Sequence, residues 1–352
     1  MKFNWKRLLN FSQGDVLGLD IGSSSVRMVQ IHRDGTECTV TAANITEIRD
    51  AQGDDSCKNS YTIDAIRDCI LSSGVSTRQA VCSVSGSEVA VRHFKFPPLE
   101  PEEIEGAIRL EAAQVCPFNI EDGVIDYKVI PNGKDAVCGI FVAATRNVVK
   151  KKVRLAKEAA LDCVLMDVDG LALLNCLNEN NVPGRQETAT AILDVGASCT
   201  TLAIMSDNKL PFVRNMSYAG KDIIAQIADE NGLTSEDVKN ELFGSEGHSL
   251  AQPQLGAGLA KACQKLMADV ADTLRYHTAQ EKTSTIDQIL VCGGFATANG
   301  FVEALNAGLS VKSVLWNPFD EMRSNVPREF LDVIRSKGPA LAVAVGLALR
   351  TI

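Results

Sequence analysis

The hydrophobic residues in the first part of the chain fall into short runs that are separated by polar turns. Apolar-rich runs of strand length cover 16–20, 26–31 and 37–48, and the turn before the last run contains Asp34 and Gly35. An Asp-Gly pair between two such runs is a hairpin signal, because glycine accepts the backbone dihedrals of a tight turn. We therefore expect three successive strands, the last two joined as a hairpin.

The same order of elements begins again further along the chain. An apolar run over 189–194 precedes a Gly/Ser turn, a second run covers 200–205, and a polar turn at 206–209 leads into a third run over 210–216. Repetition of one supersecondary unit indicates a duplicated architecture. It predicts two similar lobes that face one another.

Helical spacing of apolar residues occurs between and after these units. We expect helices over 61–73, 101–115, 146–160, 222–231, 259–280 and 339–349. The last helix is rich in small residues, and Gly338 and Gly346 allow another backbone to approach it closely. A helix that returns between the lobes and an ordinary buried C-terminal helix both fit this composition. Strands that alternate with helices predict an α/β fold, and the hairpins make its sheets mixed rather than all parallel.

Composition adds limits to this picture. A chain of 352 residues favours two lobes, and a net charge of −9 argues against non-specific nucleic-acid binding. The eleven cysteines include no C-x-x-C pair and there are only four histidines, which argues against a zinc site or a disulfide framework and fits a reducing compartment.

Nothing in the chain reads as a secretory signal or as the roughly 18 apolar residues of a membrane span. The first eleven residues mix charged and apolar side chains. We interpret them as a tail that docks through Phe3, Trp5 and Leu8, with a membrane-surface helix as the alternative.

Two Gly/Ser turns carry the candidate chemistry, because both fit the pattern D-x-G-x-S. Glycine lets the backbone approach an anion, successive N–H groups form an anion-binding nest, and serine hydroxyls donate further hydrogen bonds. The candidate phosphate-binding residues are Gly22, Ser23, Ser24, Ser25, Gly196, Ala197 and Ser198. Carboxylates repel phosphate, so we assign Asp20 and Asp194 to Mg²⁺. The alternative is a pair of ordinary hairpin turns.

A third glycine motif follows the apolar run 289–292. There Gly293 and Gly294 leave the backbone bare, so that a planar base or a phosphate can lie against it, and Phe295 comes next. After the second hairpin, Gly220 and Lys221 are further candidates for ATP binding. The alternative for Lys221 is a solvated lysine at the start of a helix.

Taken together, these motifs resemble the two phosphate motifs and the adenosine motif of the actin, sugar-kinase and chaperone ATPase superfamily. Within it the chain is most similar to the PilM family, cytoplasmic actin-like proteins of type IV pilus assembly that are related to FtsA. The likeness includes 94–118, 142–146 and 316–320 and runs from about residue 14 to the end. The family usually has Gly-Gly where this chain has Ala219 and Gly220, which bears on the contacts of this loop to the ribose.

The resemblance implies a two-lobed actin-like ATPase (ribonuclease H-like) α/β fold with mixed sheets and small inserted subdomains. ATP and Mg²⁺ would lie in the cleft between the lobes. The implied parts are a first lobe from 14–92 and 339–352, an insert from 93–165, a second lobe from 166–220 and 285–338, and its small subdomain from 221–284.

The resemblance also implies partners. The expected partner is the N-terminal cytoplasmic peptide of a PilN-like bitopic inner-membrane protein, bound in a groove between the first lobe and its insert. Contacts with pilus motor ATPases and self-association are further expectations. The protein would then be a cytoplasmic scaffold, peripheral to the inner membrane through its partner, that hydrolyses ATP slowly or not at all.

Two other functions stay open. A small-molecule kinase of the same fold needs a general base beside the γ-phosphate. Between residues 45 and 190 no further Asp motif is typical of such a base, and Asp135 and Asp162 lie in poor sequence contexts for it. An FtsA-like polymer is the other alternative. FtsA proteins carry a C-terminal amphipathic tail, and this sequence stops at Ile352 after the last expected helix, which disfavours that reading.

Overall fold

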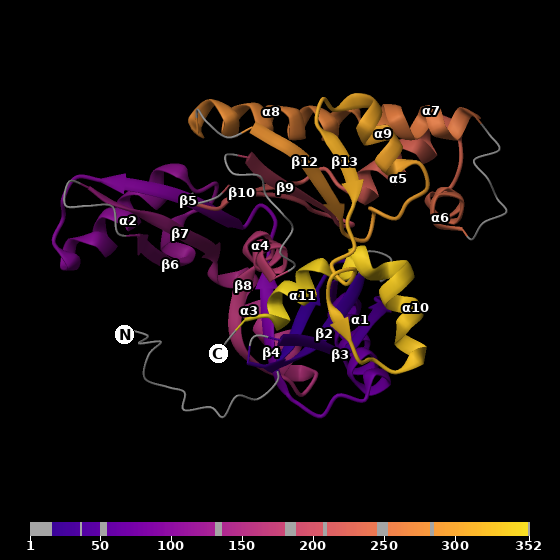
Figure 1. Cartoon of the computed structure of the whole chain (residues 1–352), viewed down its shortest axis with the longest axis horizontal. Helices are drawn as coiled ribbons and strands as arrows, with labels where there is room; N and C mark the ends of the chain where they lie inside the picture. Colours follow the sequence, from indigo (N-terminus) through magenta and orange to yellow (C-terminus); the bar gives the residue numbers. More distant parts are fainter. Residues whose placement is uncertain are drawn as a thin grey trace.

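The computed structural model describes residues 16–35, 37–49, 55–130, 136–179, 188–206, 210–244, 253–281 and 285–350. Figure 1 shows two layered bodies, one above the other, and a smaller third body at the side of both. The expected N-terminal tail, with Phe3, Trp5 and Leu8, and the residue Asp135 lie outside the described residues.

A six-stranded mixed sheet forms the lower body in Figure 1, in the order β14-β3-β2-β1-β4-β8. Its strands are β1 (Leu17–Ile21), β2 (Ser25–Asp34), β3 (Glu37–Glu47), β4 (Gln79–Val84), β8 (Asp162–Val168) and β14 (Arg323–Ser324). The pairs β1·β2 and β2·β3 are antiparallel, while β4 and β8 run parallel to β1 and β14 runs parallel to β3. Side chains alternate between its faces. Leu17, Leu19 and Met28 pack with α1 (Asp55–Ser73) and α3 (Arg146–Glu158).

A five-stranded sheet forms the upper body, in the order β11-β10-β9-β12-β13. Its strands are β9 (Thr188–Val195), β10 (Thr200–Ser206), β11 (Phe212–Met216), β12 (Thr285–Cys292) and β13 (Lys312–Leu315). The helices that pack with it are α5 (Gly220–Asn231), α6 (Ser235–Phe243), α7 (Pro253–Ala262), α8 (Gln264–Glu281) and α9 (Phe301–Gly308). In Figure 1, α7 and α8 lie along the top of this body and α6 lies at its right-hand edge.

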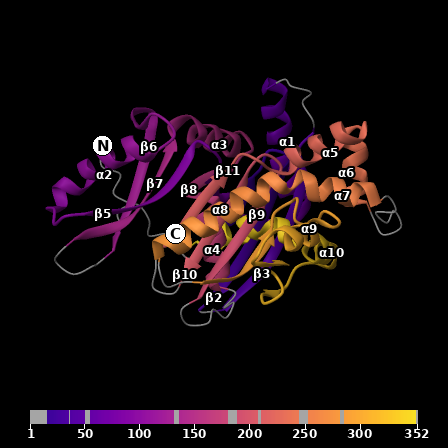
Figure 2. The same ribbon diagram turned by 90° about the horizontal axis from the view of Figure 1, so that it is seen from above.

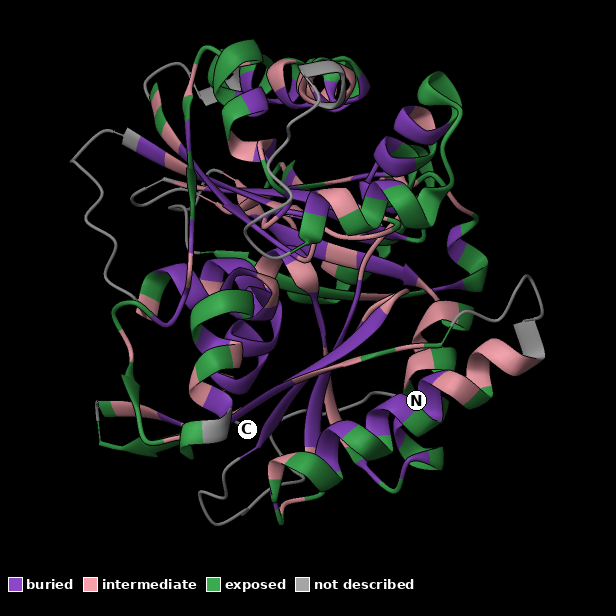
Figure 3. Cartoon of the chain, turned by 90° about the vertical axis from the view of Figure 1, so that its right-hand side faces the viewer, coloured by how far each residue is buried: buried purple, intermediate pink, exposed green. Residues whose placement is uncertain are grey.

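Two helices lie between the sheets and join them into one core. These are α4 (Asp169–Glu179) and α11 (Ala342–Ala348), which follows a 3-10 turn, η3 (Gly338–Leu341). One hydrophobic cluster includes Val29 of β2, Ile192 of β9 and the buried residues of both helices. Figure 3 shows the sheet interiors buried and the outward helix faces exposed. The last helix therefore returns between the lobes, which is one of the two placements that the small residues of 339–349 allow.

The third body is a three-stranded antiparallel sheet in the order β5-β7-β6, covered by one helix. It consists of β5 (Val89–Phe96), α2 (Pro101–Val115), a 3-10 turn η2 (Ile120–Asp122), β6 (Gly123–Ile130) and β7 (Val137–Thr145). Phe94, Ile108 and Phe141 form its core. Figure 2 shows that it extends well beyond the two larger sheets. We call residues 89–145 the insert.

The predicted mixed α/β architecture and the internal repeat are confirmed. The first repeat is the meander of β1, β2 and β3, and the second is the meander of β9, β10 and β11. The helix expected over 259–280 is instead two helices, α7 and α8, which are divided at Cys263. Within the described ranges no helix combines the length and the apolar character that a membrane crossing requires.

Strand pairing differs in three places from the expected division of the chain. Residues 146–165 were expected in the insert, but β8 pairs with β4, and α3 packs on both strands. Likewise β14 and α10 (Arg328–Lys337) were expected in the second lobe, but both lie against β3. The range 89–92 was expected in the first lobe and forms the start of β5. Long-range backbone hydrogen bonds decide membership here, and they leave no local signal in a sequence.

The close packing of α11 gives a stability prediction at Gly346. A Cβ on this residue would lie 1.8 Å from the carbonyl oxygen of Ala172 in α4, so Gly346→Ala must force the two helices apart. We expect a loss of about 1–3 kcal/mol in unfolding free energy by urea denaturation. The matched control is Gly106→Ala in α2, where a Cβ meets nothing within 4 Å and should stabilise the helix by about 0.5–1 kcal/mol. Equal effects of the two substitutions would contradict this packing.

Candidate functional site

The first phosphate-type loop connects β1 to β2. Asp20 lies near the end of β1, and the amide of Gly22 donates a hydrogen bond to the carbonyl of Ser25 at 3.0 Å. A Cβ on Gly22 would lie only 2.8 Å from the same oxygen. The tight turn therefore requires glycine at this position.

The second loop, which connects β9 to β10, has the same geometry. The amide of Gly196 donates to the carbonyl of Cys199 at 3.0 Å, and a Cβ on Gly196 would lie 2.9 Å from that oxygen. Asp194 precedes this turn as Asp20 precedes the first. The repeat predicted from sequence thus extends to individual backbone hydrogen bonds.

The two loops face each other across a cleft of about 440 Å³. The hydroxyls of Ser23 and Ser198 meet at 2.8 Å. Of the predicted residues, the cleft is lined by Asp20, Gly22, Ser23, Ser24, Asp194, Gly196, Ala197 and Ser198. Ser25 is buried at the start of β2 behind the first loop. The loops are far apart in sequence, and the fold brings them together as the repeat predicts.

Arg27 is a site residue that the motif search missed. It lies opposite Asp20 in the pairing of β1 with β2, and its Nη1 donates to Asp20 Oδ2 at 2.7 Å. The two side chains are only 10% and 9% exposed. Burial alone would lower the pKa of Arg27, but the charge and hydrogen bond of Asp20 raise it. The available signal was an arginine between the apolar residues Val26 and Met28 of a strand, since arginine is rarely buried without a partner.

Two further carboxylates lie beside this pair. Burial raises the pKa of Asp194 to about 7, and the charge of Asp169 adds to the shift, while Arg27 opposes it. Burial, followed by the charge of Asp20, also raises the pKa of Asp169. Asp169 begins α4 and lines the cleft. The sequence reasoning passed over it because its position depends on how α4 crosses between the lobes.

The third glycine motif lies directly behind Asp194. Gly293 has a φ of 97°, and a Cβ there would lie 2.3 Å from Asp194 Oδ1. A Cβ on Gly294 would lie 3.1 Å from Nη2 of Arg27. The three motifs therefore converge around Asp194 and Arg27, although Gly293 and Gly294 do not line the cleft itself.

The remaining candidates for ATP binding, Gly220, Lys221 and Phe295, contact other parts of the second lobe. Phe295 is 4% exposed, and its ring lies against Gly220 and makes an edge-to-face contact with Phe301 at 5.0 Å. The amide of Gly220 donates to the carbonyl of Gly196, and that of Lys221 to Ala197. The side chain of Lys221 is exposed. These residues brace the second loop, and none of the three candidates Gly220, Lys221 and Phe295 lines the cleft.

The carboxylates of the cleft could coordinate a metal ion only if a bound ligand supplied further oxygen atoms. Over the described ranges, no three His, Cys, Asp or Glu side chains form a group that could hold a metal ion. Magnesium in nucleotide sites binds through one or two carboxylates together with phosphate oxygens and water. Asp194 fits that pattern, whereas one oxygen of Asp20 already accepts from Arg27. The assignment of Asp20 and Asp194 to Mg²⁺ stays a prediction.

Solved structures of similar shape show the fold. A chain of the "PilM-PilN type IV pilus biogenesis complex" superposes with a TM-score of 0.81 at 23% identity, covering 96% of this chain and 99% of that one. The diol dehydratase-reactivating factor in nucleotide-free form gives 0.56 at 11% identity over 95% and 99% of the two chains. The ethanolamine utilization protein EutJ from Carboxydothermus hydrogenoformans gives 0.54 at 12% identity over 98% and 93%.

These neighbours have the actin-like ATPase fold, which is also the fold of this chain. The sequence itself matches one protein family from residue 18 to residue 352, which is nearly the whole chain. That family is described as type IV pilus assembly protein PilM. The chain therefore belongs to the PilM family of type IV pilus assembly proteins.

Proposed function

We propose that the protein is a Mg-ATP-binding scaffold of a type IV pilus or related secretion platform. The observation that carries this proposal is the pair of loops with identical turn geometry, which meet through Ser23 and Ser198 across one cleft. Backbone amides, glycines and hydroxyls at both loops are suited to the phosphates of a nucleotide. Binding between the lobes would set how far they close.

The charges in the cleft suggest how the phosphates are accommodated. Three carboxylates would repel a polyphosphate, and Arg27 is the buried cation among them. Lys152 of α3 lines the same cleft and donates to the carbonyl of Ile21. Mg²⁺, held by Asp194 with Asp20 nearby, would neutralise further phosphate charge.

The proposed partner is the N-terminal cytoplasmic peptide of a PilN-like inner-membrane protein. A relative of the same shape was solved as part of a PilM-PilN complex, which supports this class of partner. The groove would lie between the first lobe and the insert, beside the loop at 85–88 that leads into the insert and also lines the cleft. Contacts with pilus motor ATPases, self-association and a cytoplasmic position beside the membrane belong to the same proposal.

A pull-down from detergent-extracted membranes, with and without ATP, tests this function. The expected result is recovery of a bitopic protein, competed by a synthetic peptide of its N-terminal segment and altered by ATP. Failure to recover such a protein under both conditions would contradict the scaffold function.

A small-molecule kinase is the competing function, and one observation favours it. Asp169 is a buried carboxylate with a raised pKa that faces the cleft, as a general base would. Rapid transfer of ³²P from labelled ATP to a sugar or small acid, lost in Asp169→Asn, would support the kinase. The scaffold proposal predicts little transfer to any small molecule.

A further inference from the structure

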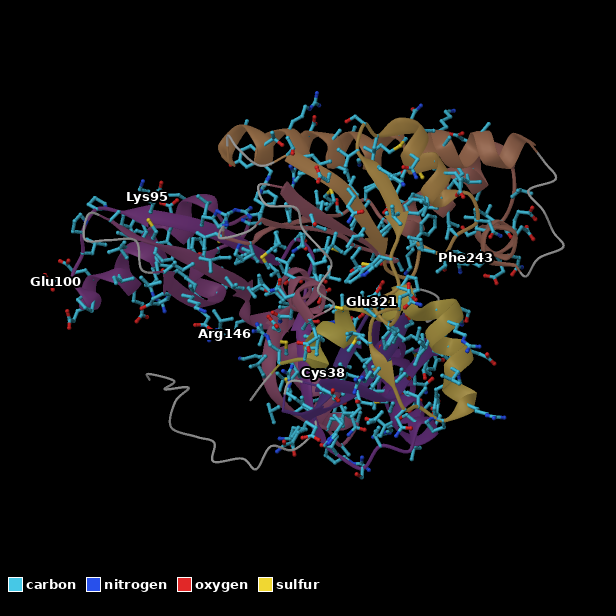
Figure 4. All side chains as sticks on the ribbon, viewed as in Figure 1. Cys38, Lys95, Glu100, Arg146, Phe243 and Glu321 are labelled. Atoms are coloured by element: carbon cyan, nitrogen blue, oxygen red, sulfur yellow. The ribbon has the colours of Figure 1, made fainter. Side chains whose placement is uncertain are left out.

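The insert emerges from the first lobe but also contacts the second. Its strand β5 lies against β11 of the five-stranded sheet. The ring Nε2 of His93 in β5 is 2.9 Å from the carbonyl oxygen of Pro211, just before β11. Figures 1 and 2 both show the insert beside the upper sheet, and Figure 4 places Arg146 where α3 leaves it. The insert is therefore held from both lobes.

One side chain of the second lobe holds the root of the insert. Asn215 in β11 donates through Nδ2 to the carbonyl of Gly86 at 3.1 Å and to that of Val89 at 3.4 Å. Its Oδ1 accepts from the hydroxyl of Thr201 in β10 at 3.0 Å. Thr201 and Gly86 both line the cleft. A single amide thus links a cleft side chain to the point where the insert begins.

Both chain connections of the insert meet at this corner. The amide of Val89 donates to Gly86, and the amide of Thr145, the last residue of β7, donates to the carbonyl of Glu88 at 3.0 Å. The hydroxyl of Thr145 donates to Glu88 Oε1 at 2.6 Å, and its oxygen also caps α3 through the amide of Val148. A displacement of residues 86–89 therefore reaches both ends of the insert and the start of α3.

We propose that Asn215 is a positioning residue that ties the insert to the second lobe, so that closure of the cleft on a nucleotide moves the insert against the first lobe. The inference rests on the nucleotide binding of the proposed function and adds a route by which it acts. The lobes cannot rotate apart while the amide keeps both bonds to the loop at 86–89. The insert must follow the second lobe, which changes its position against the first lobe.

Hydrogen exchange followed by mass spectrometry on the full chain tests this tie, with ATP and Mg²⁺ as the probe. In the wild type, saturating ATP should slow amide exchange at least ~5-fold in peptides that cover 20–25 and in peptides that cover 86–96. A factor of ~5 is the lower end of the usual coupling between two sites. In Asn215→Ala the slowing should persist at 20–25 and disappear at 86–96.

Two more variants separate the tie from a general loss of packing. His93→Ala removes another contact between the insert and the second lobe, but His93 does not line the cleft, so the response at 86–96 should remain. Asn215→Asp keeps the side-chain volume and the acceptor for Thr201 and loses the donor to Gly86 and Val89. It should behave like Asn215→Ala, which keeps the test valid if the alanine variant does not fold.

The outcomes distinguish this inference from the function on which it rests. A response at 20–25 without one at 86–96 in the wild type would overturn the tie and leave nucleotide binding intact. A response at 86–96 that persists in both Asn215 variants would overturn it as well. No response at either segment in the wild type would contradict nucleotide binding, and the tie with it.

Discussion

Replacement of Arg27 by methionine should lower the unfolding free energy by about 3–5 kcal/mol, the usual consequence of removing one partner of a buried ion pair. Methionine has a similar length and removes the charge. Asp20, at 9% exposure, would then be a buried carboxylate without its cation, close to Asp194 and Asp169. Urea denaturation at pH 7.5 without nucleotide measures the effect.

The double variant Arg27→Met with Asp20→Asn separates this cause from lost packing. It should recover at least half of the loss, because the uncompensated charge is gone. The matched surface control is Arg109→Met, which breaks the exposed Arg109–Glu105 pair at 57% and 62% exposure and should cost less than ~0.5 kcal/mol. A loss in Arg27→Met no larger than in Arg109→Met would show that the buried pair does not stabilise the cleft.

Asp194→Asn should have the opposite effect on the empty protein. Burial raises the pKa of Asp194 to about 7, which means that the fold disfavours its charged form. An amide of the same shape removes that cost. We expect the melting temperature at pH 8, measured in EDTA, to rise by at least ~2 °C.

The same pKa shift predicts how the stability gain of Asp194→Asn depends on pH. The folded pKa of about 7 exceeds the ordinary value of 3.8, so between these pH values the folded protein holds a proton that the unfolded chain has released. The contribution of Asp194 to stability therefore falls as pH rises from about 4 to 7. Asparagine does not titrate, so the advantage of Asp194→Asn should be larger at pH 8 than at pH 5. An advantage that is equal at both pH values would contradict the assignment of the shift to Asp194.

The phosphate-type loops were predictable because their signal is local. A strand, a D-x-G-x-S turn and a second strand are contiguous, and steric limits at Gly22 and Gly196 leave little choice of backbone. Repetition of that unit predicted two facing lobes. The helix α2 was also predictable to its exact bounds, because proline begins it and two glutamates follow in its first turn.

The remaining features depend on long-range placement. Arg27 becomes part of the site through the pairing of β1 with β2, and Asp169 through the path of α4 between the sheets. Asn215 reaches Val89, the first residue of the insert, across 126 residues of sequence. The motifs predict ligand contacts for Lys221 and Phe295, and these stay predictions: the Lys221 side chain is exposed and the Phe295 ring packs in the aromatic core. Figure 4 shows Phe243, which contacts Phe295, at the end of α6.

The central claim is that the two loops together hold the phosphates of a nucleotide. Calorimetric titration of Mg-ATP into the full chain and into Asp194→Ala tests it most directly. We predict one site per chain with a dissociation constant of about 1–100 μM in the wild type, weakened at least ~100-fold in Asp194→Ala, which is about 2.7 kcal/mol. Micromolar binding that is retained in Asp194→Ala, or no binding to the wild type at millimolar ATP, would contradict the claim.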